Sequence, residues 1–267
     1  MAAVGCGTSY YVAQAYASLR EQAGAGETDA FPASEMPLGR AYDAVVAITR
    51  SGTTTEVLDL IPRLGRVPLL VAITAVPQAR VVDLAPSTVV LGFADEASVV
   101  QTRFATSALA LLRAHLGDDV PSLAREAGEV LAAPLPFDPT RFGQFIFLGR
   151  GAGAALANEA ALKMRETGAA WTEAYPAMEF RHGPISTLGP HSAVWSLGTA
   201  PDGLAGEVRS TGAAWHESAA DPMVTLVHIQ RLAVTNARGK GFDPDRPRFL
   251  TRSVILPEGS TLRTQET

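Results

Sequence analysis

Short apolar stretches alternate with longer amphipathic stretches along most of the chain, and turns rich in glycine or hydroxyl residues separate them. Tyr42–Ile48, for example, has the apolar character of a buried strand, and the residues from Glu56 onward repeat apolar positions at helical spacing. After a first helix at 8–24, the pattern predicts strands and helices in alternation at 43–49, 54–64, 68–75, 78–84, 87–93 and 98–116. Such alternation is typical of a parallel sheet that is covered by helices on both faces, so we expect an α/β fold.

The same pattern restarts after a polar stretch. A strand, a glycine turn and an alanine-rich helix recur with a shift of 144 residues, so that Gly5 corresponds to Gly149 and Gly7 to Gly151. We therefore expect two similar lobes, at residues 1–116 and 141–267, with a linker helix within 117–140. In the second lobe the pattern predicts helix 153–167, strand 192–197, helix 203–211, strand 212–216, helix 223–240 and a last strand at 253–256.

The first predicted strand is short. Met1–Val4 precedes the glycine turn, whereas a sheet of this kind normally leads into that turn with about five or six apolar residues. We expect a preceding helix and part of this strand to be missing from the sequence as given.

Composition restricts the class of protein. With 47% hydrophobic and 18% charged residues the chain can form a large core, and its net charge of −5 argues against nucleic acid and anionic membranes as partners. No apolar run reaches transmembrane length and no signal peptide is visible, while the single cysteine, Cys6, cannot form an internal disulfide. We expect a cytoplasmic protein. The five histidines show no paired metal-ligand spacing, so we predict no metal and no other cofactor.

Two loops have the character of a phosphate site. Gly5–Ser9 and Thr49–Glu56 each follow a strand and open a helix, where backbone N–H groups and the helix dipole favour an anion. Their hydroxyls and Arg50 add donors, and the lysine-containing loop of nucleotide-binding proteins is absent, which favours a single phosphate on a small polyol. The alternative is that both are ordinary turns and helix caps. In the second copy Thr8-Ser9 is replaced by Ala152-Gly153, so we assign phosphate binding to the first lobe only.

A second group of polar residues lies on the predicted helix 153–167. Glu159, Lys163 and Glu166 are spaced to share one face, and alanines surround them, as in a closely packed helix. A carboxylate held beside an ammonium can act as a general base, and the alternative is a solvated ion pair. His182 follows in the irregular segment 171–184, where it either moves protons or caps a turn.

With these motifs the chain resembles the sugar isomerase (SIS) fold family in its two-lobed, flavodoxin-like form. The matching segments are GCGTS (5–9), TRSGTTTE (49–56), VVQTRFAT (99–106), NEAALKMRE (158–166), AYPAMEFRHGP (174–184) and DPDRPRFLTRSV (243–254). The resemblance implies a homodimer in which Glu166 moves a proton between C1 and C2, and in which His182 opens the sugar ring in the neighbouring subunit's site. It further implies that Glu159 and Lys163 support this site and that the phosphate is bound by Ser9, Thr49, Arg50, Ser51, Thr54 and Gln101.

Two departures separate this chain from the glucosamine-6-phosphate synthases of that family. Arg252 stands where they carry a lysine that forms an imine, which a permanently protonated arginine cannot do, and the glutamine-hydrolysing domain is absent. At Gln101 the family often has a serine. We therefore predict an aldose–ketose isomerase or an amino-sugar 6-phosphate deaminase. A non-catalytic phosphosugar sensor is the alternative, and an aminotransferase fits less well.

Overall fold

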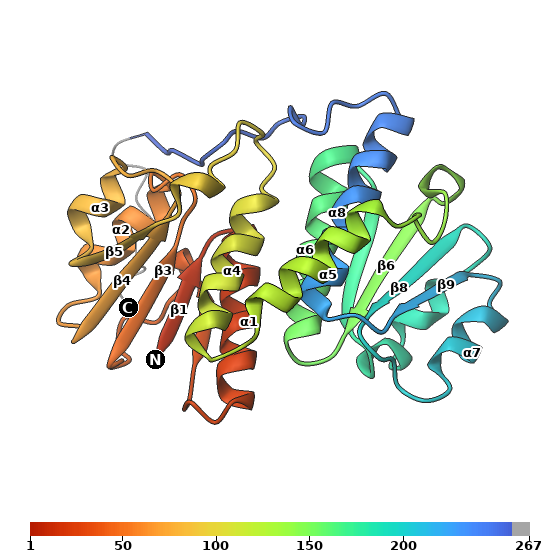
Figure 1. The fold of residues 1–267 in the computed structure, drawn as a ribbon, viewed down its shortest axis with the longest axis horizontal. Coiled ribbons are helices and arrows are strands. Elements are labelled where there is room, and N and C mark those ends of the chain that lie inside the picture. The colour runs from red at the N-terminus through yellow and green to blue at the C-terminus, as the bar shows by residue number, and fades with distance from the viewer. Residues whose placement is uncertain (258–267) are drawn as a thin grey trace, which may run out of the picture. The chain divides into compact units, whose positions relative to one another are not determined.

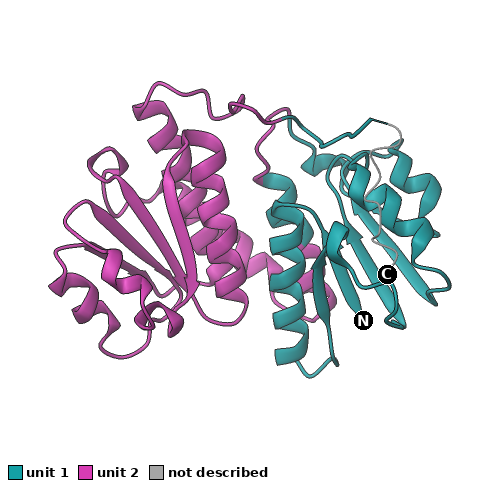
Figure 2. Cartoon of the chain, turned by 180° about the vertical axis from the view of Figure 1, so that it is seen from behind, with its two compact units in different colours: residues 1–96, 103–108, 251–267 teal, residues 97–102, 109–250 magenta. Residues whose placement is uncertain are grey.

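The computed structural model describes residues 1–257 and has an α/β fold with two parallel sheets flanked by helices, as the sequence predicts (Figure 1). The chain divides into two compact units (Figure 2). Unit 1 contains residues 1–96, 103–108 and the C-terminal segment from Thr251, and unit 2 contains residues 97–102 and 109–250. The C-terminal segment thus packs with the first sheet although the chain reaches it from the second.

Unit 1 is built around a sheet of five parallel strands in the order β2-β1-β3-β4-β5. Its strands are β1 (Ala2–Gly5), β2 (Asp29–Pro32), β3 (Ala44–Ile48), β4 (Leu69–Thr74) and β5 (Ser87–Val90). Its helices are α1 (Thr8–Gln22), α2 (Thr55–Arg63) and α3 (Arg80–Leu84), and α4 (Arg103–His115) begins in this unit. This is the strand order of flavodoxin-like folds. Such folds bind ligands where the strand order reverses, beside β1 and β3.

Helices cover both faces of this sheet. On one face Val57, Leu60 and Ile61 of α2 pack with Val81 of α3 against buried strand residues such as Val45. Helix α1 lies on the opposite face (Figure 1). Burial on both faces explains why the strands are apolar along their length and do not alternate.

Unit 2 has four parallel strands in the order β7-β6-β8-β9, which corresponds to the order of the first four strands of unit 1. Its strands are β6 (Gln144–Gly149), β7 (Trp171–Pro176), β8 (Ser192–Leu197) and β9 (Ala214–Ser218). Its helices are α5 (Val120–Ala132), α6 (Ala152–Gly168), α7 (Leu204–Ser210) and α8 (Pro222–Gly239). Helix α7 packs on one face through Leu204 and Val208, and α6 pairs with α8 on the other (Figure 1).

The glycine turn of the sequence repeat has the same conformation in both units. Gly7 has φ 55° and ψ −124°, and Gly151 has φ 52° and ψ −126°. A Cβ on Gly149 would lie 2.2 Å from the backbone of Gly153, and a Cβ on Gly5 would lie 2.6 Å from the backbone of Ser9. Each strand therefore ends on a glycine because the first turn of the next helix lies directly over it.

Four sequence predictions about elements were wrong. No strand is predicted between the first helix and 43–49, but β2 lies there, and its four residues are too few to stand out at a sheet edge. The segment 171–184 begins with the edge strand β7. The last strand at 253–256 is absent, and α4 begins at Arg103, five residues later than predicted. In the described part of the chain no helix is long and apolar enough to cross a membrane.

Candidate functional site

The two predicted phosphate loops follow neighbouring strands. β1 pairs directly with β3, with Val4 opposite Ala47, so the loops that begin at Cys6 and Thr49 leave the same edge of the sheet side by side. This edge, at the carboxyl ends of the strands, is where α/β folds bind ligands.

Gly52 fixes the conformation of the second loop. It has φ +63°, and a Cβ at this position would lie 2.4 Å from Cβ of Ala79 and 2.8 Å from Cγ1 of Val81. The Gly52 carbonyl also accepts a hydrogen bond from the Val81 amide at 3.1 Å. The loop is therefore packed against the start of α3, which holds its hydroxyl side chains in place.

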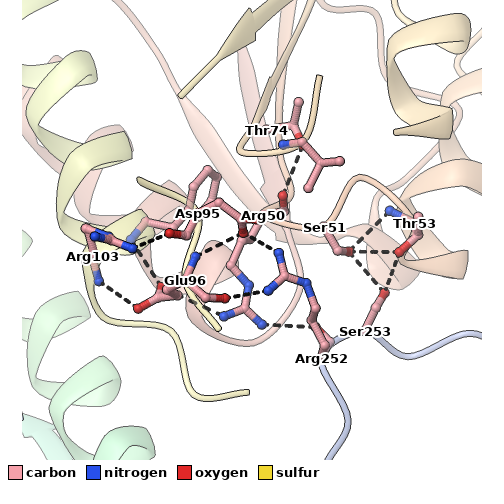
Figure 3. A network of polar contacts seen from close by, with 11 residues as sticks. Arg50, Ser51, Thr53, Thr74, Asp95, Glu96, Arg103, Arg252 and Ser253 are labelled. Carbon is pink, nitrogen blue, oxygen red and sulfur yellow. Dashed lines mark hydrogen bonds and ion pairs between the residues drawn. The ribbon is translucent and has the colours of Figure 1, made fainter. Parts of the chain in front are cut away.

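The hydroxyls of this loop converge on one point. Oγ of Ser51 and Oγ1 of Thr53 lie 3.1 Å apart, and each lies 3.1 Å from Oγ of Ser253 (Figure 3). Oγ1 of Thr54 lies 3.3 Å from the same Ser253 oxygen. The C-terminal segment thus places one hydroxyl at the centre of the group of loop hydroxyls, a position that has three hydroxyls within hydrogen-bonding distance.

Backbone hydrogen bonds fasten the C-terminal segment to this loop. The Thr55 amide donates to the Val254 carbonyl at 3.1 Å, and the Leu256 amide donates to Oγ1 of Thr55 at 2.9 Å. These bonds use groups at the start of α2, where backbone amides lack helical partners.

Arg50 lies in the loop but is buried, and its guanidinium points away from the loop hydroxyls (Figure 3). Nη1 lies 3.8 Å from the carboxylate of Glu96, and Nη2 donates to the Arg252 carbonyl at 3.1 Å. Oγ1 of Thr74 donates to the Arg50 carbonyl at 3.1 Å. In this structure the guanidinium therefore joins the loop to Glu96 and to the C-terminal segment.

Asp95 and Glu96 complete this network (Figure 3), and pattern analysis of the sequence missed them. The guanidinium of Arg252 pairs with the Asp95 carboxylate and donates to the Glu96 carbonyl. The Glu96 carboxylate accepts from the amides of Arg103 and Phe104 at 3.2 and 3.3 Å, which caps the start of α4. An acidic pair shortly before a predicted helix was the available signal.

The other residues predicted to bind phosphate, Ser9, Thr49 and Gln101, lie in three different environments. Ser9 is buried in the first turn of α1. Thr49 is also buried, and its hydroxyl has no hydrogen-bond partner within the described chain. Gln101 belongs to the segment 97–102 of unit 2, where its buried amide oxygen likewise lacks a partner among residues 1–257.

In unit 2, helix α6 brings together the three charged residues that the sequence places on one face. Nζ of Lys163 lies 2.6 Å from Oε2 of Glu166 and 3.3 Å from Oε1 of Glu159. Lys163 and Glu159 are buried, whereas the Glu166 side chain keeps 20% of its surface exposed. The arrangement is therefore a buried charge cluster with one accessible carboxylate, and not a solvated ion pair.

The charge state of this cluster follows from its environment. Burial of the ammonium lowers the pKa of Lys163, but the carboxylates of Glu159 and Glu166 offset burial and hold this pKa above its ordinary value. The Lys163 ammonium is therefore the cation shared by the Glu159 and Glu166 carboxylates.

His182 lies elsewhere in unit 2, at the end of a short 3₁₀ helix (Glu179–Arg181). Its amide donates to the Glu179 carbonyl at 2.9 Å, while its imidazole is exposed and makes no hydrogen bond with the described residues. The side chain is thus available to solvent or to another molecule.

Cys6 lies in the first loop. Burial and the nearby carboxylate of Glu56 raise the pKa of its thiol to about 11. The thiol stays protonated at neutral pH and is a poor nucleophile. The described residues contain no group of three potential metal ligands.

Comparison with known proteins places this geometry in context. No family model matches the chain. The glutamine–fructose-6-phosphate aminotransferase [isomerizing] of a Nostoc species is 29% identical over 95% of this chain and 51% of its own length. The chain spans about half the length of that relative.

Solved structures share the fold over nearly the whole chain. Glucosamine-6-phosphate deaminase from Thermotoga maritima superposes with a TM-score of 0.84 at 24% identity, covering 96% of this chain and 90% of that one. Tagatose-6-phosphate ketose/aldose isomerase from Escherichia coli gives 0.78 at 16% identity, covering 96% and 86%.

Proposed function

Starting from the fact that the chain belongs to the sugar isomerase (SIS) family, we propose that it is a phosphosugar isomerase or an amino-sugar phosphate deaminase. Unit 1 would bind the phosphate and unit 2 would transfer the proton between C1 and C2. The proposal includes the interpretation of the two units as tandem copies of one lobe, supported by the shared glycine turns and strand order.

One observation carries the proposal: three loop hydroxyls converge on a single oxygen at the ligand-binding edge of the sheet. Ser51, Thr53 and Thr54 surround Oγ of Ser253, and an oxygen of a phosphate group would find the same donors. The N-terminus of α2 lies at this loop and favours negative charge. Ser9 and the unpartnered hydroxyl of Thr49 are further candidate donors. When a phosphate group binds here, either the C-terminal segment moves away from the loop, or it stays and Ser253 becomes a further donor to the phosphate.

The chemistry is assigned to α6. Glu166 has an accessible carboxylate 2.6 Å from the Lys163 ammonium, so it is suited to abstract the proton at C2 and return it at C1. Glu159 balances the buried ammonium. His182, which is exposed, would open the sugar ring, and we propose that it does so in the partner's site of a homodimer. A chain that stays monomeric in sedimentation at assay concentration would contradict this last part.

The identity and contacts of Arg252 argue against the aminotransferase alternative. Arg252 stays protonated and is engaged with Asp95, so it cannot supply the amine of an imine. Isomerisation and deamination need only phosphate anchoring, ring opening and a proton shuttle. We therefore favour these two reactions for the described chain.

The test is calorimetric titration with glucose 6-phosphate, fructose 6-phosphate and glucosamine 6-phosphate. Wild-type protein should bind at least one of them, and the double substitution Ser51→Ala with Thr54→Ala should weaken that binding at least tenfold. Each lost bond to a charged group is worth roughly 1.5–3 kcal/mol. Ketose formation and ammonia release, followed with the same sugars, distinguish isomerase from deaminase.

The matched control replaces two exposed hydroxyl residues of unit 2, Ser210→Ala with Thr235→Ala, and should bind as wild type does. Unchanged affinity in the Ser51/Thr54 variant would refute the phosphate assignment. Binding without any turnover would favour the sensor over the enzyme.

A further inference from the structure

The C-terminal segment at 251–257, which belongs to unit 1, uses the donors that the loop before α2 would offer to a phosphate. Oγ of Ser253 lies 3.1–3.3 Å from three hydroxyls of this loop, those of Ser51, Thr53 and Thr54. The amide of Thr55, the first residue of α2, donates to the Val254 carbonyl at 3.1 Å. A phosphate bound at this helix start would need the same hydroxyls and the same amide.

The cation of the loop also contacts the segment. Nη2 of Arg50 donates to the Arg252 carbonyl at 3.1 Å, and Nη1 lies 3.8 Å from the Glu96 carboxylate (Figure 3). The hydroxyl oxygen of Ser253 thus stands where an oxygen of a phosphate would find its donors. Two oxygen atoms cannot occupy this position together, so a phosphate that takes it has to displace the segment.

The contacts that hold the segment are polar and partly exposed. The Arg252 guanidinium pairs with the Asp95 carboxylate and donates to the Glu96 carbonyl (Figure 3). The side chains of this ion pair are 36% and 41% exposed, and exposed ion pairs contribute little stability. The segment also buries little apolar surface, because Val254 stays 51% exposed and Ile255 68%. A ligand that forms stronger hydrogen bonds with the loop can therefore replace it.

We propose that residues 251–257 are an internal competitor for phosphate, which closes the loop in the free protein and leaves it when a sugar phosphate binds. The inference rests on the proposed function, because that function places the phosphate at this loop. Hydrogen bonds to a charged phosphate are about twice as strong as those to the neutral Ser253 hydroxyl, so phosphate displaces the segment at sufficient concentration. Only protein with an open loop binds the ligand, so the segment raises the apparent dissociation constant.

The first test weakens the hold on the segment by removing either charge of its ion pair. In calorimetry with inorganic phosphate and with the hexose 6-phosphates, Arg252→Gln and Asp95→Asn should each lower the dissociation constant about threefold, which is what an exposed ion pair is worth. Long-range attraction of phosphate by Arg252 predicts the opposite for the first variant, because that variant loses a positive charge. Weaker or unchanged binding by the Arg252→Gln protein would overturn the proposal.

The matched control is Arg40→Gln, which also removes one arginine charge from unit 1. Arg40 pairs with Asp29 at 3.2 Å, and both side chains are exposed, as in the pair that holds the segment. This variant should bind phosphate no more tightly than wild-type protein does. A gain in affinity equal to that of Arg252→Gln would overturn the proposal, because the gain would then not depend on the segment.

Hydrogen–deuterium exchange of wild-type protein gives a second test that needs no variant. The Leu256 amide donates to Oγ1 of Thr55 at 2.9 Å, so it is protected while the segment is in place. Saturating ligand should speed up exchange in the peptide that contains Leu256. Slower or unchanged exchange with bound ligand would overturn the internal competitor and leave the phosphate site intact, with Ser253 as a further donor. If neither phosphate nor any hexose 6-phosphate binds, the proposed function fails, and the inference fails with it.

Discussion

At the scale of single residues, the most constrained group is the ammonium of Lys163. It is buried between the carboxylates of Glu159 and Glu166, and Glu159 is itself fully buried. Burying these charges costs free energy that their attraction must offset, so the three groups stabilise the fold only as a set. Of the two carboxylates, only that of Glu166 is accessible to solvent.

Lys163→Met should therefore lower the free energy of unfolding by about 3–5 kcal/mol, because it leaves buried carboxylate charge without its cation. The measurement is urea unfolding at pH 7. The control is Lys240→Met at the other lysine, which is exposed after α8 and should change stability little. Replacing Glu159 by Leu in the Lys163→Met background should recover part of the loss. A Lys163→Met protein as stable as wild type would contradict the buried cluster.

Sequence reasoning found the members of this cluster, since helical spacing alone brings Glu159, Lys163 and Glu166 to one face. It could not predict which groups the Arg50 guanidinium contacts. The partners of its guanidinium, Glu96 and the carbonyl of Arg252, are distant in the sequence, and only the fold brings them together. The contact between Ser51 and Ser253 is hidden for the same reason.

At the scale of elements, the glycine turns couple each strand to the helix that follows. The turn at Gly149 needs a residue without a side chain because the backbone of Gly153 in α6 lies over it. The turn at Gly5 meets the start of α1 in the same way. This close approach aims the N-terminus of the helix at the edge of the sheet.

Gly149→Ala should destabilise the protein by at least about 1–3 kcal/mol, since a Cβ 2.2 Å from backbone atoms forces the start of α6 to shift. Gly143→Ala is the matched control, because a Cβ there meets no atom within 4 Å. Thermal unfolding of the two variants should differ by several degrees. Equal melting temperatures would show that the turn tolerates a side chain at position 149.

The central elements of each sheet were predictable because they are apolar over a full strand length, and the glycine turns marked where they end. The edge strands were not. β2 has four residues, and β7 mixes exposed Trp171 with polar neighbours, so neither shows a clear period. The segment 253–256 has strand-like composition, but it lies along the loop before α2 and joins no sheet.

At the scale of the whole molecule, we propose that unit 1 binds the phosphate and unit 2 transfers the proton. The chain enters unit 2 through 97–102, returns to unit 1 for 103–108, enters unit 2 again at Leu109 and returns to unit 1 at Thr251. A variant that loses proton transfer should therefore keep phosphate binding, which separates the two roles experimentally.

The most direct measurement is deuterium incorporation at C2 of the sugar phosphate that binds most tightly, followed by NMR in deuterated water. Wild-type protein should exchange this hydrogen. Glu166→Gln keeps the shape of the side chain but cannot accept a proton, so exchange should fall by about 10²–10⁴-fold while calorimetric affinity is retained. Exchange at the wild-type rate in the Glu166→Gln protein, or none in wild-type protein with a sugar that binds, would contradict the account.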